Sequence, residues 1–149
     1  MNPEKGMQEC SAVWAAMPCT LLHAPCWLNQ QRVPKCLIDT GSEVNLISVR
    51  DATRRALPYF PGGVQAIKGF NGDVTSVVGN TMCDMSFYPN GKTMQVEFLV
   101  VKHLSDGPII GMPTLAAFAM GVDCTLPGLF ELSTGQVLRC SAVQRPRKN

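Results

Sequence analysis

The sequence predicts an all-β domain with one or two short helices. The chain has 149 residues, 46% of them hydrophobic and 16% charged, which is the composition of a single globular domain and not of a disordered chain. Most of it consists of short runs of strand-forming residues separated by turn residues. Only residues 49–57 and 113–120 carry helix signals.

The first part of the domain alternates apolar runs with breaks. Pro25 interrupts one apolar stretch, and Asn29-Gln30 has the composition of a turn. The expected strands cover residues 19–22, 26–28, 32–38 and 45–47. Ser48 followed three residues later by Asp51 resembles a helix capping box, so a short helix is expected over Val49–Leu57, ending before Pro58.

Two hairpins are expected in the middle of the chain. The pair Asn71-Gly72 tolerates the positive φ values of tight turns, and it predicts a hairpin with the tip 69–72. A second pair, Asn90-Gly91, joins two further strand-like runs. The expected strands cover residues 64–68, 73–78, 82–88 and 93–101.

The last third begins with a short strand and a helix. Ile109-Ile110-Gly111 follows a turn, and Pro113 suits the first position of a helix that runs to about Met120, with Gly121 as its stop. Short strands follow to the end of the domain. We expect a leader over residues 1–18, the domain over 19–140 and a basic tail over 141–149.

Charge and cysteine usage exclude several classes of protein. A net charge of +2 is too small to predict nucleic acid as a partner, and no run of about 18 apolar residues indicates a membrane span. The seven cysteines include no Cys-x-x-Cys pair, which argues against a structural zinc site and a complete disulfide framework. Free buried thiols in a reducing, cytoplasmic compartment are the expectation.

The most informative segment runs from Cys36 to Ser48. Asp39 directly follows a buried apolar strand, where a carboxylate is costly unless it has a use. Gly41 permits a tight loop, and the hydroxyls of Thr40 and Ser42 can bond to the backbone or to the carboxylate. This Asp-Thr-Gly loop resembles the active-site signature of retropepsins, the aspartic proteases of retroviruses and long-terminal-repeat retrotransposons.

Other segments extend the resemblance from about Cys19 to Cys140. The run 28–33 is similar to the hairpin that leads into the family's catalytic loop. Ile109-Ile110-Gly111, followed by Leu115, is similar to its second motif. The resemblance implies a retropepsin-like closed β-barrel with one lobe per chain. It also implies an aspartic-type endopeptidase that needs no metal or cofactor.

The count of Asp-Thr-Gly loops implies a homodimer. The chain has a single such loop, so two copies would pair about a two-fold axis, with the two Asp39 carboxylates facing each other. The resemblance implies that Thr40 and Gly41 belong to the same catalytic loop and that Thr40 contacts the partner across the axis. It also implies that the terminal strands of the two subunits interleave. The expected substrates are peptides of a polyprotein or of host proteins.

The resemblance also implies the residues that contact substrate. Gly69-Phe70-Asn71-Gly72 would form the tip of a flap that closes over the substrate. Further contacts are expected from the catalytic loop, the flap strand and the second motif, and these residues are Ser42, Val44, Ile67, Ile109 and Ile110. For each apolar member, plain core packing is the alternative interpretation.

One departure from the family leaves alternatives open. Many members carry Arg or Asp after the second-motif glycine, where the charge helps to bind the subunits, but this chain has Met112 and Pro113. Glu43 therefore has no basic partner from that segment. The alternatives are a catalytically weak or inactive dimerisation or scaffold module, and an unrelated β-barrel binding domain.

Overall fold

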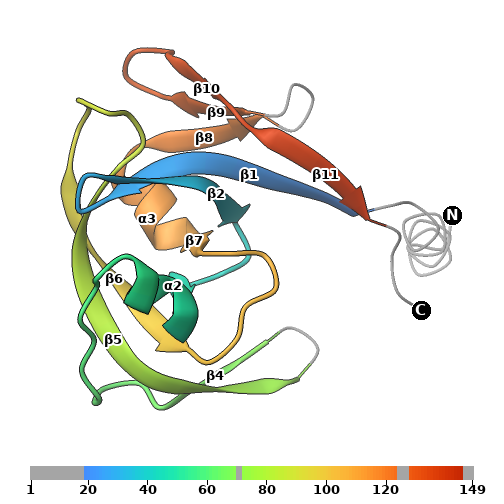
Figure 1. Cartoon of the computed structure of the whole chain (residues 1–149). Coiled ribbons are helices and arrows are strands. Elements are labelled where there is room, and N and C mark those ends of the chain that lie inside the picture. The colour runs from blue at the N-terminus through green and yellow to red at the C-terminus, as the bar shows by residue number, and fades with distance from the viewer. Residues whose placement is uncertain (1–18, 70–71, 124–127, 146–149) are drawn as a thin grey trace, which may run out of the picture.

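The computed structural model describes residues 19–69, 72–123 and 128–145, and strands dominate these ranges. The prediction of a mostly β domain with short helices is confirmed (Figure 1). The elements are β1 Cys19–Leu28, β2 Gln31–Asp39, β3 Leu46–Ser48, α2 Val49–Arg54, β4 Ala66–Lys68, β5 Val74–Ser86, β6 Met94–Val101, β7 Ile109–Gly111, α3 Met112–Ala117, β8 Met120–Asp123, β9 Gly128–Glu131, β10 Val137–Arg139 and β11 Ser141–Arg145.

One large sheet and one small sheet hold the strands. The 8-stranded sheet has the order β11-β1-β2-β7-β3-β6-β5-β4, and the 3-stranded sheet has the order β10-β9-β8. Trp27 and Leu28 at the end of β1 also pair with β5, so the large sheet curls back on itself. Figure 1 shows the long β5 and β6 bending around the two helices.

Strand β1 is continuous where a break was expected at Pro25. Its pairing with β2 shifts register between Ala24 and Cys26, which places the proline at a bulge. Between these two pairs Pro25 stands opposite two residues of β2, Pro34 and Lys35, so the extra residue of the bulge belongs to β2. The hydrogen-bond ladder is interrupted at this point, so it tolerates the missing N–H of Pro25. The expected turn at Asn29-Gln30 is present, with φ values of 47° and 68°.

Strand β5 likewise joins two runs that were expected to be separate. It pairs with β6 along most of its length, with a register shift between Val77 and Gly79. A Cβ on Gly79 would lie 2.8 Å from the carbonyl oxygen of Phe60, which bridges to the neighbouring Asn80. The glycine therefore lets the Phe60 backbone approach β5 closely.

Helix α2 begins as predicted, α3 begins one residue before the predicted Pro113, and both end earlier than expected. The Ser48 side chain accepts a hydrogen bond from the Asp51 N–H (3.1 Å) at the start of α2, which confirms the cap. Helix α2 ends at Arg54 and not at Leu57, because Ala56 takes a positive φ of 54°. Helix α3 ends at Ala117, and Ala119 at φ 53° turns the chain into β8.

Gly121 is therefore not the stop of a helix, as we expected, but a residue of β8. It pairs with Phe130 of β9, and a Cβ at Gly121 would collide with the Phe130 ring. The glycine is needed for packing of the small sheet and not for capping.

The chain end also differs from the expected tail over 141–149. Ser141–Arg145 forms β11, which pairs antiparallel with β1 from Cys19↔Arg145 to His23↔Ser141. Figure 1 shows these two strands running side by side away from the rest of the sheet. This ribbon leaves β11 as one edge of the large sheet.

Two apolar clusters form the interior. The larger one lies between the large sheet, the helices and β9, with fully buried members such as Phe98, Ile110 and Leu129. The smaller one consists of Leu46, Leu99 and Val101, with partly buried neighbours that include Val44, Ile67 and Ile109. This smaller cluster supports the loops that surround Asp39.

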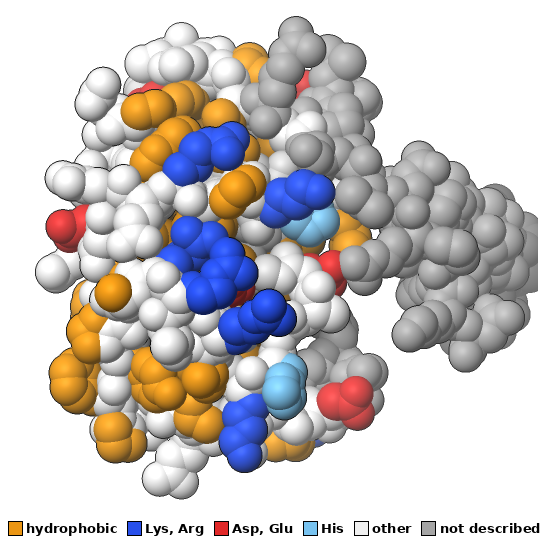
Figure 2. All heavy atoms as spheres, viewed as in Figure 1, with side chains coloured by type: hydrophobic (Ala, Val, Ile, Leu, Met, Phe, Trp, Pro, Cys, Tyr) orange, Lys and Arg blue, Asp and Glu red, His pale blue; other side chains and the backbone are white. Residues whose placement is uncertain are grey.

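Figure 2 shows Lys and Arg side chains spread over the centre of the face seen in Figure 1. Arg55, just after α2, joins that helix to β2, because its guanidinium donates to the Arg32 carbonyl (3.2 Å) and its own carbonyl accepts from Gln31 (3.0 Å). Arginine here fastens a short helix to the sheet.

Neither helix in the described ranges has the length and apolar character needed to cross a membrane.

Candidate active site

Asp39 lies where β2 meets the short strand β7. Strand β7 sits between β2 and β3 in the sheet, and it runs parallel to β2 with Asp39 opposite Gly111. The chain leaves β2 at Asp39, loops around the end of β7 and re-enters the sheet as β3, which pairs with β7 through Leu46 and Ile109. The two sequence motifs, 111 − 39 = 72 residues apart, are therefore adjacent.

A tight turn fixes the Asp39 side chain. The Gly41 N–H donates to Oδ1 of Asp39 (3.0 Å), and the Ser42 N–H donates to its backbone carbonyl (3.1 Å). The Ser42 hydroxyl donates to the Val44 carbonyl (2.7 Å) and closes the next turn. Asp39 is half-buried and Thr40 is exposed. The loop thus presents a carboxyl group in one defined orientation.

Gly111 of the second motif allows the loop to pack on β7. A Cβ at Gly111 would lie 2.6 Å from the Val44 carbonyl oxygen and 2.8 Å from that of Ser42. The Met112 N–H also donates to the Ser42 carbonyl (2.8 Å). Since real Cβ atoms do not approach backbone oxygens so closely, glycine is required at this position.

Asn45 is a positioning residue that sequence reasoning missed. Its Nδ2 donates to the Glu97 carbonyl (3.0 Å) and to the Thr114 hydroxyl (2.7 Å), and its Oδ1 accepts from the Gly111 N–H (2.8 Å). It is 6% exposed. This one side chain therefore connects the loop that follows Asp39 to β6, β7 and α3. In the sequence, only its position six residues after Asp39 could have pointed to this positioning role.

A cleft of about 740 Å³ opens beside Asp39. Its size is within the range of ligand-binding sites. The lining residues are Asp39, Gly41, Ser42, Glu43, Val44, Leu46, Ile67, Lys68, Gly69, Asp73, Thr75 and Ile109. Seven of these are predicted site residues, namely Asp39, Gly41, Ser42, Val44, Ile67, Gly69 and Ile109. Residues distant in the sequence thus meet beside Asp39.

The hairpin of β4 and β5 forms one wall of this cleft. Ala66–Lys68 pairs with β5, and the Gly69 N–H donates to the Asp73 carbonyl (2.8 Å). Gly72 takes φ +87°, as the Asn-Gly turn predicts. Phe70 and Asn71, which we predicted at the flap tip, lie outside the described residues.

Three predicted site residues do not line the cleft. Ile110 is fully buried in the larger cluster, because its side chain points to the opposite face of β7 from that of Ile109, so it packs the core instead. Gly72 lies beyond the cleft's lining residues, in the hairpin turn. Thr40 borders a separate hollow of about 310 Å³, together with Asp39 and the apolar side chains of Leu21, Leu22, Leu37, Ile38 and Val122.

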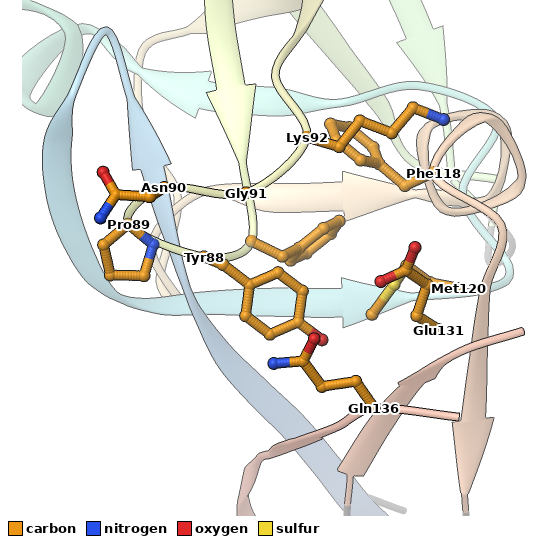
Figure 3. A pocket seen from close by; sticks show the side chains of 10 residues that line it. Tyr88, Pro89, Asn90, Gly91, Lys92, Phe118, Met120, Glu131 and Gln136 are labelled. Carbon is orange, nitrogen blue, oxygen red and sulfur yellow. The ribbon is translucent and has the colours of Figure 1, made fainter. Parts of the chain in front are cut away.

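Another cavity, of about 410 Å³, lies away from Asp39 (Figure 3). Phe87 and Phe118 meet edge-on beside it, with ring centroids 5.1 Å apart. Burial, followed by the charge of Glu131, raises the pKa of Tyr88. Its lining residues are Phe87, Tyr88, Pro89, Asn90, Gly91, Lys92, Phe118, Met120, Glu131 and Gln136. Glu131 is its one carboxylate, and two side-chain hydroxyls already donate to it.

Comparison with known proteins gives a likeness of structure and none of sequence. Models of protein families give no match, and no curated protein matches. The retroviral protease-like domain of Ddi1 from Leishmania major is similar in structure, with a TM-score of 0.61 and 21% identity over 83% of this chain and 95% of that one.

Two further solved structures agree. EIAV protease, solved in complex with the inhibitor HBY-793, has a TM-score of 0.55 and 16% identity over 68% of this chain and 90% of its own. A retropepsin-like aspartic protease from Rickettsia conorii has a TM-score of 0.51 and 18% identity over 69% of this chain and 84% of its own. Together with the placement of β7 between β2 and β3 beside Asp39, these likenesses show that the chain has the retropepsin-like fold.

Proposed function

We propose that the chain is an aspartic endopeptidase that works as a C2 homodimer, each copy forming one closed-barrel lobe. The observation that carries the proposal is the Asp39 carboxyl, held by the Gly41 N–H at the edge of the 740 Å³ cleft. The structural likeness to retropepsins supports the same reaction class. Asp39, Thr40 and Gly41 are the proposed catalytic loop.

The proposed chemistry needs two Asp39 side chains. Two carboxyl groups about 3 Å apart cannot both ionise easily, so the pair holds one proton and titrates as a unit. The ionised oxygen takes a proton from a water molecule, which attacks the peptide carbonyl carbon. The protonated carboxyl donates to the carbonyl oxygen, and a later proton transfer releases the amine. The half-buried setting of Asp39 strengthens these interactions.

Three features of the single chain support pairing of two copies. Thr40 is exposed beside Asp39, and the hollow that it borders is walled by apolar residues of β1, β2 and β8. Strand β11 forms an edge of the large sheet in the described part of the chain. An unpaired edge is a template for another strand, so it suits the proposed interleaving of terminal strands.

The cleft suits an extended peptide. Val44, Leu46, Ile67 and Ile109 supply apolar wall, and the smaller core cluster holds them in place. The hairpin of β4 and β5 can close over a bound chain and exclude water. We propose peptides of a polyprotein or of host proteins as substrates, and a reducing cytoplasmic location, which the free thiols of Cys26, Cys36, Cys83 and Cys140 support.

Cleavage of a peptide library tests the proposal. Asp39→Asn keeps the size of the side chain and removes the acid, so turnover should fall at least about 10³-fold, by analogy with the loss of other catalytic groups. Asp84→Asn is the matched control, because Asp84 is exposed on β5 and outside the cleft. Equal turnover by wild type and Asp39→Asn would remove the protease assignment.

A dimerisation or scaffold module is the second candidate. It is favoured by Met112 and Pro113, which are exposed at the start of α3 where many retropepsins carry charges. In the described ranges Glu43 is exposed and no ion pair holds it. This candidate predicts dimers in sedimentation experiments without cleavage of any library peptide.

A further inference from the structure

Two buried cysteines on neighbouring strands face each other. Cys26 of β1 and Cys36 of β2 have their sulfur atoms 2.6 Å apart, although the residues are 10 positions apart in the sequence. The two cysteines are diagonal neighbours across the β-bulge, since Ala24 pairs with Cys36 while Cys26 pairs with Val33. Both thiols are free, and both residues are 0% exposed.

The two sulfur atoms are only slightly farther apart than in a disulfide bond. A disulfide needs a sulfur separation of about 2.05 Å on neighbouring strands, so the two atoms have only about half an ångström left to close. The hydrogen bond with Cys36, followed by burial, raises the pKa of Cys26. The pair is therefore preorganised for bonding, while the Cys26 thiol stays protonated at neutral pH.

We propose that Cys26 and Cys36 are an oxidation site that forms an intrachain disulfide with a small peroxide as oxidant. The site is independent of the proposed protease function, because neither sulfur lines the Asp39 cleft. The disulfide would fasten β1 to β2, the strand that ends at Asp39.

The reaction balances with hydrogen peroxide alone. The thiolate of one cysteine attacks a peroxide oxygen, the O–O bond breaks, and a sulfenic acid and hydroxide form. The second thiol then attacks the sulfenic sulfur, an S–S bond forms, and water leaves with the proton. Two thiols and one peroxide give one disulfide and two water molecules, so each sulfur is oxidised by one electron and the peroxide is reduced by two.

Burial sets the choice of oxidant and the rate. A bulky disulfide such as oxidised glutathione would have to form a mixed disulfide with a sulfur that has no exposed surface. Peroxide is small enough to reach the pair through local opening. Because the thiolate is scarce when the pKa is raised, oxidation should be slow, taking minutes to hours and not seconds.

Peptide mapping of the full chain tests the site. The protein is incubated with hydrogen peroxide, which is then removed with catalase. It is unfolded in urea with N-ethylmaleimide present to label free thiols, and is digested with trypsin and chymotrypsin. Trypsin cuts between the two cysteines at Arg32 and Lys35, and chymotrypsin separates Cys26 from Cys10 and Cys19. The expected product is a Cys26–Cys36 linked peptide pair. Labelled, unlinked Cys26 and Cys36, or a link from Cys26 to Cys83, would overturn the proposal.

Thermal melting provides a second readout. The disulfide closes a short loop, so the melting temperature of the oxidised wild type should exceed that of the reduced form by roughly 5–10 °C. Cys36→Ser should abolish this difference, and Cys83→Ser, the matched control at a third buried thiol, should retain it. Should Cys36→Ser not fold, the wild-type peptide map decides alone. A difference of the same size in a folded Cys36→Ser variant would also refute the assignment.

Discussion

Replacement of Asn45 by alanine should destabilise the protein more than any other polar substitution near the cleft. The side chain makes three hydrogen bonds, at 2.7, 2.8 and 3.0 Å, to groups from three different elements. Asn45→Ala removes all three at once. It leaves the Gly111 N–H and the Thr114 hydroxyl buried without their partner.

The magnitude follows from the number of bonds. A net hydrogen bond contributes about 1 kcal/mol, and a buried polar group left unpaired costs about 1–3 kcal/mol. Asn45→Ala should therefore lower the free energy of unfolding by about 3–4 kcal/mol. Thr114→Val removes only the 2.7 Å bond, so it should cost about 1 kcal/mol.

Urea denaturation at one fixed protein concentration measures these losses. In the double variant the Thr114→Val change should cost less than it does alone, because its partner is already gone. The m-value should stay constant across the series. A loss below about 1 kcal/mol for Asn45→Ala, with an unchanged m-value, would show that the network does not hold the loop.

Three further predictions concern the cap, the second motif and a buried thiol. Ser48→Ala removes the hydrogen bond from the Asp51 N–H and should cost about 1 kcal/mol in urea denaturation, against nothing for Ser76→Ala at an exposed position of β5. Gly111→Ala forces a Cβ against the Val44 carbonyl and should abolish library cleavage and lower the melting temperature; wild-type behaviour would contradict the packing described. Burial raises the pKa of Cys83 from 9.0 to about 12. The unfolded chain therefore loses the thiol proton at a lower pH than the folded chain does. The free energy of unfolding should fall as pH rises from 9.0 to about 12. Cys83→Ala should show a shallower decline of melting temperature there, and parallel declines would refute the shift.

Local signals predicted most of the elements. The Ser48 cap and the Asn29-Gln30 turn depend on residues adjacent in the sequence, and the structure contains both. Gly72 has the positive φ that an Asn-Gly pair predicts. The strand, Asp-Thr-Gly and Ile-Ile-Gly patterns carried the fold resemblance for the same reason. Such features need no knowledge of distant partners.

Features that depend on distant partners could not be predicted. Asn45 bonds to groups 52, 66 and 69 residues away, so nothing beside it in the sequence marks its role. Gly121 looked like a helix stop because its partner Phe130 lies on another strand. The Cys26–Cys36 contact depends on how β1 pairs with β2, and from the sequence alone Pro25 was taken for a break between two strands.

Mixing wild type with Asp39→Asn tests the shared active site most directly. If each site needs one Asp39 from each of two copies, the variant pairs with wild-type chains to form inactive heterodimers. With random pairing and a nine-fold excess of variant, activity per wild-type chain should fall to about one tenth, whereas the same excess of Asp84→Asn should not reduce it. Activity that stays constant as Asp39→Asn is added, in a mixture shown to exchange subunits, would contradict the shared site.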